Sequence, residues 1–416
     1  MSGFVDRTAS PVEYLEQMAT QVPDLAEDFY TPMATYCRSK LWHQLTTKAM
    51  EFVTSPTTKK AVPPERFLEL YDKVIMAFPN DLNALAVAQI TSHVSNALLP
   101  SDPTAARTIL ENQKRRAQTE GTSNLFAEST TTNPPPSPAL LFLESKLVSL
   151  QLALDTAVDT NACKEILNAH TKWLVALDET SGAAVHAAHY EAAMAYYKRV
   201  GPPQAFYEQG MAFLQYAPPG SDTSSTTNYH QLAVDLVLAA LTGDGVYNLG
   251  QVEQNPILTV LHNTPDAWLL DVLSACAAGD VTRFDQVTQQ HAAAMAQQPA
   301  LLNRATAVQE KLKLLALVWL VFRKPPHERT LVFDDIATAL HVPVDQVEWV
   351  LMRAMSVELL KGKIDEVEQT VEITWLLPRV LNAGQMQDLA NRLGAWATTV
   401  QTTHADVQQQ AAPVLG

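Results

Sequence analysis

The chain has 416 residues, a formal net charge of −15 and 47% hydrophobic residues, which is enough apolar material for two or three structural units. Its 14 glycines and three widely separated cysteines argue against phosphate-cradling loops, a disulfide framework and a zinc cluster. The longest apolar run, residues 314–322, is too short to cross a bilayer, and the first residues lack the pattern of a signal peptide. We therefore expect a soluble intracellular protein.

From residue 1 to about residue 323 the sequence predicts a TPR-like solenoid of paired helices. The stretch "DAWLLDVLSACAAGDVTRFDQVTQQHAAAM" shows the pattern best: an apolar stripe at helical spacing, a turn at Gly279 and Asp280, and a partner helix. We expect Thr264 to cap the first helix of this pair, with Pro265 as its first residue. Such a stack offers a long surface and favours a scaffolding role.

Two stretches interrupt the helical pattern. Residues 119–138, "TEGTSNLFAESTTTNPPPSP", combine Ser, Thr and a run of Pro, and we interpret them as a flexible insertion. Residues 217–228 are a shorter loop of the same composition.

Residues 324–381 have the order of a winged helix, which is helix, turn, helix and hairpin. The pattern predicts a short helix from about Asp334 to Leu340, a turn through residues 341–343, and a second helix. One face of that second helix is apolar and consists of Val344, Val347, Val350, Leu351, Ala354 and Val357. A small β hairpin follows, in which Lys363 and Ile364 begin one strand. In the other strand Val371, Ile373 and Trp375 alternate with polar residues.

The charge of this winged helix argues against binding to DNA or RNA. Residues 327–381 contain five Lys and Arg against ten Asp and Glu, a local charge of −5. The hairpin turn carries Glu366 and Glu368 where a wing would meet a phosphate. A winged helix that binds other proteins fits this charge better than a nucleic-acid-binding regulator.

The tail, residues 382–416, predicts a helix from roughly 384 to 410 with a narrow apolar seam. Its apolar positions recur at alternating spacings of three and four. They are Met386, Leu389, Leu393, Trp396, Val400 and Val407, with Thr403 in the same register. Two interpretations remain open: the seam packs on the protein's own repeats, or it enters a bundle with helices of other chains. The narrow seam favours the bundle.

No catalytic constellation emerges from the chain. His327 starts a sequence like that of a zinc-protease helix, but Leu331 occupies the place of the second histidine. His186 and His189 share a helical face near Glu191 and lack a third ligand at suitable spacing, so we interpret them as ordinary packing or surface histidines. There is no P-loop or nucleophile elbow. We expect no enzyme activity, no cofactor, no metal and no small-molecule substrate.

Helical repeats that lead into a C-terminal winged helix are similar to the PCI-domain proteins. The stretches "NTPDAWLLDVL", "GDVTRF", "KGKIDEVEQTVEITW", "PRVL" and "LANRLGAWATTV" resemble the PCI-domain subunits of the 26S proteasome lid over about residues 140–405. The resemblance implies a non-catalytic scaffold in the regulatory particle, found in cytoplasm and nucleus and bound to other PCI and metalloprotease-fold subunits. It implies no nucleic acid or membrane as a partner.

By that resemblance two parts of the chain would contact partners. The terminal helix would join a helical bundle through its seam, and the hairpin would extend a sheet into a neighbouring chain. The hairpin contacts would be Lys363, Ile364, Val371, Ile373 and Trp375. A PCI subunit of the signalosome or of a translation initiation factor is the alternative assignment, against which Trp375 and "PRVL" argue.

Overall fold

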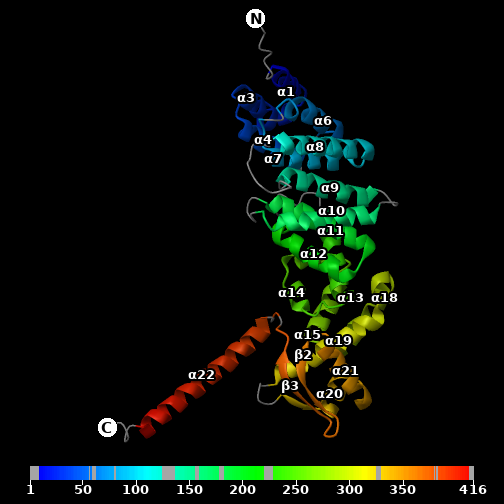
Figure 1. Ribbon diagram of the computed structural model, residues 1–416, viewed down its shortest axis with the longest axis vertical. Coiled ribbons are helices and arrows are strands. Elements are labelled where there is room, and N and C mark those ends of the chain that lie inside the picture. Colours follow the sequence, from blue (N-terminus) through cyan, green and yellow to red (C-terminus); the bar gives the residue numbers. More distant parts are fainter. Residues whose placement is uncertain are drawn as a thin grey trace. The chain divides into compact units, whose positions relative to one another are not determined.

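The computed structural model describes residues 9–55, 57–58, 62–78, 81–123, 136–154, 159–177, 182–219, 228–324, 329–378, 380 and 383–411. The chain divides into two compact units, Met1–Asn228 and Tyr229–Gly416 (Figure 1). In the described parts of the chain, no helix combines the length and the apolar character needed to span a membrane.

The described part of the first unit consists of helices that stack in successive layers along the chain (Figure 1). They are α1 (Ala9–Gln21), α2 (Pro23–Leu25), the π-helix η1 (Ala26–Tyr30), α3 (Thr31–Arg38), α4 (Trp42–Thr54), α6 (Pro64–Leu70), the π-helix η2 (Tyr71–Ile75), α7 (Ala84–Leu98), α8 (Pro103–Ser123), α9 (Pro138–Leu154), α10 (Thr160–Leu174), α11 (Ala183–Val200) and α12 (Pro203–Tyr216). Neighbours in the sequence pack as pairs, for example α7 with α8 and α11 with α12. This order confirms the predicted helical solenoid.

Local sequence signals fix where several of these helices begin. The side chain of Asn83 accepts a hydrogen bond from the backbone N–H of Leu85 at 2.9 Å, which caps α7. Asp159 caps α10 in the same way through the N–H of Asn161 at 3.0 Å. These caps satisfy backbone donors that have no partner inside the helix.

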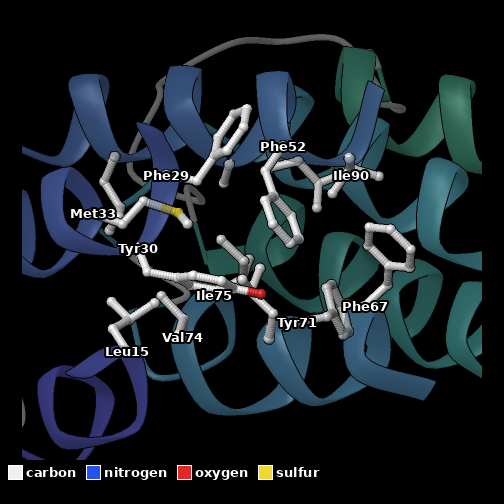
Figure 2. Close-up of a cluster of buried hydrophobic side chains, with 14 of the residues drawn as sticks. Leu15, Phe29, Tyr30, Met33, Phe52, Phe67, Tyr71, Val74, Ile75 and Ile90 are labelled. Atoms are coloured by element: carbon white, nitrogen blue, oxygen red, sulfur yellow. The ribbon is translucent and has the colours of Figure 1, made fainter. Parts of the chain in front are cut away.

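The N-terminal core is rich in aromatic side chains (Figure 2). The ring of Phe52 lies 5.5 Å, centroid to centroid, from the rings of Phe29, Tyr30 and Phe67, in tilted or edge-to-face arrangements. Such contacts add to the stability gained by burying the rings. The core therefore joins helices from α1 to α7 into one body.

The second unit begins with helices and continues into a small sheet. Its helical part comprises α13 (Tyr229–Thr242), α14 (Leu249–Glu253), the 3-10 helix η4 (Pro256–Leu261), α15 (Trp268–Ala278), α16 (Val281–Gln290), α17 (Ala292–Ala296), α18 (Pro299–Asn303) and α19 (Ala305–Arg323). The α15 and α16 pair confirms the predicted helix, turn and helix, with Gly279 in the left-handed region at φ 64°.

The predicted start of α15 is wrong. This helix begins at Trp268, and the hydroxyl of Thr264 donates backwards to the carbonyl of Leu261 at 2.7 Å. Thr264 thus closes the turn that follows η4 and does not cap α15, so Pro265 precedes the helix.

The winged helix follows α19 and confirms the predicted order. It contains β1 (Thr330–Val332), α20 (Phe333–Leu340), α21 (Val344–Ser356), β2 (Leu360–Asp365) and β3 (Thr370–Leu376). The three strands form an antiparallel sheet in the order β1-β3-β2, with a register shift between Lys361 and Gly362. One buried cluster joins α19, α20, α21 and the sheet, so α19 is packed into the core of the winged helix.

The last described element is α22 (Ala383–Ala411), which Figure 1 draws as one uninterrupted helix. It confirms the helix predicted for residues 384–410. The domain boundaries predicted at 323 and 381 remain predictions. Of the predicted insertion, residues 119–123 continue α8 and Pro138 begins α9, whereas residues 124–135 lie outside the described residues. Most of the shorter loop, residues 220–227, also lies outside them, as does His327.

Candidate assembly surface

The apolar seam of α22 is exposed to solvent. The six side chains named from the sequence are between 41% and 67% exposed, with Leu389 the least and Trp396 the most. They are Met386, Leu389, Leu393, Trp396, Val400 and Val407. Among the described residues none of α22 belongs to a buried cluster. The seam is therefore not part of any buried cluster in the described part of its own unit.

Val380, three residues before α22, contacts two other residues of the second unit. The N–H of Val380 donates to the side-chain oxygen of Asn248 at 3.2 Å. Gly250 lies so close that a Cβ on it would stand 2.9 Å from the carbonyl oxygen of Val380. On α22 itself, Arg392 donates to the carbonyl of Arg323 at 3.0 Å. Val380 and Arg392 thus contact the rest of the second unit, while the seam of α22 stays exposed.

Of the five hairpin residues that the sequence predicts as partner contacts, some are buried in the core and others lie at the surface. Val371 and Ile373 are buried in the winged-helix core, but the alternation predicted for β3 ends there, because the register shifts beside Trp375 and its side chain is exposed. Lys363 is exposed and Ile364 is half-buried on β2. Trp375 is 38% exposed, and the Nζ of Lys361 lies 5.2 Å from its ring centroid. A partner could therefore meet the side chains of Lys363, Ile364 and Trp375, but not those of Val371 and Ile373.

The strand order decides which backbone edge is open. β3 lies between β1 and β2, pairing with β2 along its whole length and with β1 over Thr370–Glu372. β2 is the longer of the two outer strands, with six residues against three in β1. An open outer strand is a template for pairing with another chain. Any extension of this sheet across β2 would run along Leu360–Asp365.

The tip of the hairpin is acidic and locally ordered. The Oδ1 atom of Asp365 accepts hydrogen bonds from the N–H groups of Val367 and Glu368, both at 3.1 Å. This side-chain turn fixes a tip that presents Glu366 and Glu368 to solvent. The geometry agrees with the charge argument, because a phosphate approaching this tip would meet carboxylates.

The sequence interpretation missed two exposed apolar residues on α21, Trp349 and Met352. They occupy the outer face, opposite the buried Val347, Val350 and Leu351. A large aromatic and a methionine three residues apart on the polar side of an amphipathic helix were the signal that could have revealed them.

The histidines considered as metal ligands are core residues. His186 and His189 are both buried on α11. The ring of His186 stacks on that of Tyr216 with centroids 4.7 Å apart. Burial, assisted by His170 and His186, lowers the pKa of His189 to about 4. In the described part of the chain, no three His, Cys, Asp or Glu residues are grouped in a way that could hold a metal.

Comparison with known families agrees with this architecture. The family described as PSD13 N-terminal repeats matches residues 29–273, and the PCI domain matches residues 288–375. The chain is therefore a PCI-domain protein with N-terminal helical repeats. Because the first match covers more than half of the chain, it belongs to the PSD13 family, that of 26S proteasome non-ATPase regulatory subunit 13.

Individual relatives support the same family over nearly the whole length. The 26S proteasome non-ATPase regulatory subunit 13 of Dictyostelium discoideum is 28% identical over 95% of this chain and 96% of its own. Homolog B of that subunit in Arabidopsis thaliana is 29% identical over 96% and 97%. Translation initiation factor 3 subunit M of Coccidioides immitis is 23% identical over only 57% of this chain and 49% of its own. The comparisons thus favour the proteasome family over the initiation factor.

Proposed function

We propose that the protein is a non-catalytic structural subunit of the 26S proteasome lid. In this role it scaffolds assembly of the regulatory particle for ubiquitin-dependent degradation. The family supports the assignment, and the exposed seam of α22 is the single observation that carries it. A helix of 29 residues whose apolar stripe is interrupted only at Thr403 gains most of its stability when another helix covers that stripe.

The proposed mechanism of assembly uses two surfaces. The seam of α22 packs into a bundle with C-terminal helices of other lid subunits, both PCI and metalloprotease-fold. The open edge of β2 extends the winged-helix sheet toward one neighbour, with Lys363, Ile364 and Trp375 beside it. The β2 contact selects the partner through its side-chain charges, whereas the seam supplies most of the apolar burial.

The charge distribution supports proteins as the partners. The acidic hairpin tip and the local charge of −5 disfavour DNA and RNA. By the same proposal the protein has no cofactor, no small-molecule substrate and no membrane contact, and it works in cytoplasm and nucleus within the proteasome.

The direct test is to remove α22. A chain ending at residue 382 should remain folded, because α22 contributes nothing to the described buried clusters, yet it should not join the lid. Each form would be tagged at its N-terminus and isolated from its own cells, and the co-purifying subunits would be quantified by mass spectrometry. We expect lid, base and core subunits to co-purify in near-equal amounts with the full chain and not with the shortened chain.

Other outcomes separate the alternatives. Recovery of signalosome or initiation-factor subunits with the full chain would replace the assignment while keeping the fold. Recovery of lid subunits with the shortened chain would exclude the seam as the assembly surface. Salt-sensitive binding of the purified protein to DNA or RNA would favour a nucleic-acid-binding regulator.

A further inference from the structure

The outer face of α21 carries an apolar spot that the fold does not use. Trp349 is 52% exposed and Met352 is 50% exposed. The two side chains are neighbours, because residues three apart lie on the same side of a helix. The opposite face of α21 already supplies Val347, Val350, Leu351 and Ala354 to the winged-helix core. Trp349 and Met352 are therefore surplus to the packing of this unit.

The spot is bordered by acidic side chains on one side. Asp345 and Glu348 lie four residues before Trp349 and Met352 respectively, one turn away on the helix. Arg353 lies four residues after Trp349 and is the only Lys or Arg of α20 and α21. On α21 the spot thus has two acidic neighbours on one side and Arg353 on the other.

We propose that Trp349 and Met352 form a docking site for a further protein, one that offers an apolar cleft bordered by lysine or arginine. Tryptophan and methionine are enriched in the centres of protein interfaces, where they fill pockets on the partner. The acidic border would attract the basic rim of such a cleft and orient it. The same border repels nucleic acid, the ligand that this helix binds in winged-helix DNA readers.

This docking site is separate from the two surfaces of the proposed function. It lies on α21, whereas assembly uses α22 and the open edge of β2. The proposal therefore predicts that the site can lose its partner while the protein still joins its assembly. For that reason the failure of one proposal can be distinguished from the failure of the other.

The test is site-specific photocrosslinking in the full chain. The crosslinking residue p-benzoylphenylalanine replaces Met352 in cells, and in a control it replaces Leu302, which is 56% exposed on α18. We expect Met352, but not Leu302, to give a crosslink to one protein. Mass spectrometry should place that crosslink in an apolar segment with Lys or Arg on its border.

Two substitutions make the test specific. Trp349→Ala should lower the crosslink yield about tenfold, since it removes the central anchor. Asp345→Lys should lower it as well and remove its dependence on salt. The matched control Leu302→Ala should leave the yield unchanged, and none of the three should change the lid subunits that co-purify.

Several results would overturn the docking site. These are a yield no higher than that at Leu302, a crosslink to nucleic acid or to the same chain, and a contact segment without basic residues. An unchanged yield in Trp349→Ala would overturn it too.

Discussion

Substituting Leu393 by Asp separates the stability of the monomer from its assembly. Leu393 lies in the middle of the α22 seam and is 56% exposed in the single chain. Exposed substitutions usually change the free energy of unfolding by less than about 0.5 kcal/mol. The monomer of Leu393→Asp should therefore unfold at nearly the same temperature as the unsubstituted chain.

The expected loss in assembly is much larger. Full burial of a leucine contributes about 2 kcal/mol, so covering the exposed half of Leu393 contributes about 1 kcal/mol. An aspartate in the covered seam adds an unpaired buried charge, which raises the total loss to about 3 kcal/mol or more. A loss of that size weakens binding at least about 100-fold.

The assay compares three tagged chains: unsubstituted, Leu393→Asp and Thr398→Asp. Thr398 is exposed on the same helix, away from the seam, so it controls for the added charge. Co-purifying subunits would be quantified by mass spectrometry, and thermal unfolding of each purified monomer would be followed by circular dichroism. An equal fall in monomer stability for Leu393→Asp would show that the seam packs on its own chain. Equal assembly of all three chains would refute the seam as an interface.

Three further predictions concern the interior. His189 should make the fold acid-sensitive, because its pKa is about 4 in the folded chain and near 6.5 in the unfolded chain. The free energy of unfolding should therefore be highest above pH 6.5 and fall as the pH falls, by about 2 kcal/mol at pH 5. Urea unfolding at pH 7.5 and pH 5 should show this loss, and His189→Gln should reduce it. Gly279→Ala should destabilise the chain by more than about 2 kcal/mol in thermal unfolding, because its Cβ would stand 2.9 Å from the Cα of Ala316 and φ is 64°. Its control, Gly394→Ala, meets nothing within 4 Å and should raise the helicity of α22. The buried Nζ of Lys311 donates to the carbonyls of Ala240 at 2.6 Å and Gly243 at 2.9 Å. Lys311→Met should therefore lower the free energy of unfolding in urea by about 2 kcal/mol. The control Lys313→Met should lower it much less.

Periodicity predicted the elements that depend on local sequence. The structure contains three features at the positions predicted from the sequence: the apolar stripe on α21, the turn at Gly279 and the seam of α22. β1 was not predicted, because a strand of three residues has too little periodicity and forms only by pairing with β3. Thr264 was misread for a related reason. The cap signal Thr-Pro is local, whereas the contact of its hydroxyl with Leu261 depends on the preceding 3-10 helix.

The candidate surface was predicted in part. Alternation in β3 indicates that Val371 and Ile373 share a face, but only the packing of α19 and α21 shows that this face is the core. Conversely, Trp349 and Met352 are large apolar residues of the kind that usually packs in a core. Only their position on α21 opposite Val350 shows that they are exposed. Sequence patterns assign residues to faces, whereas tertiary packing decides which face is covered.

The composition of α22 couples its helical structure to its assembly. Gly394 lies in mid-helix, where glycine costs about 1 kcal/mol relative to alanine. The helix also carries four threonines, at positions 398, 399, 402 and 403, whose hydroxyls donate back to carbonyls of the preceding turn. With no cover on its seam, such a helix is only marginally stable. Covering the exposed halves of six apolar side chains would contribute roughly 6 kcal/mol, enough to offset this weak propensity. The helix should therefore become rigid on assembly, and its partners should contribute to its folding as well as to its binding.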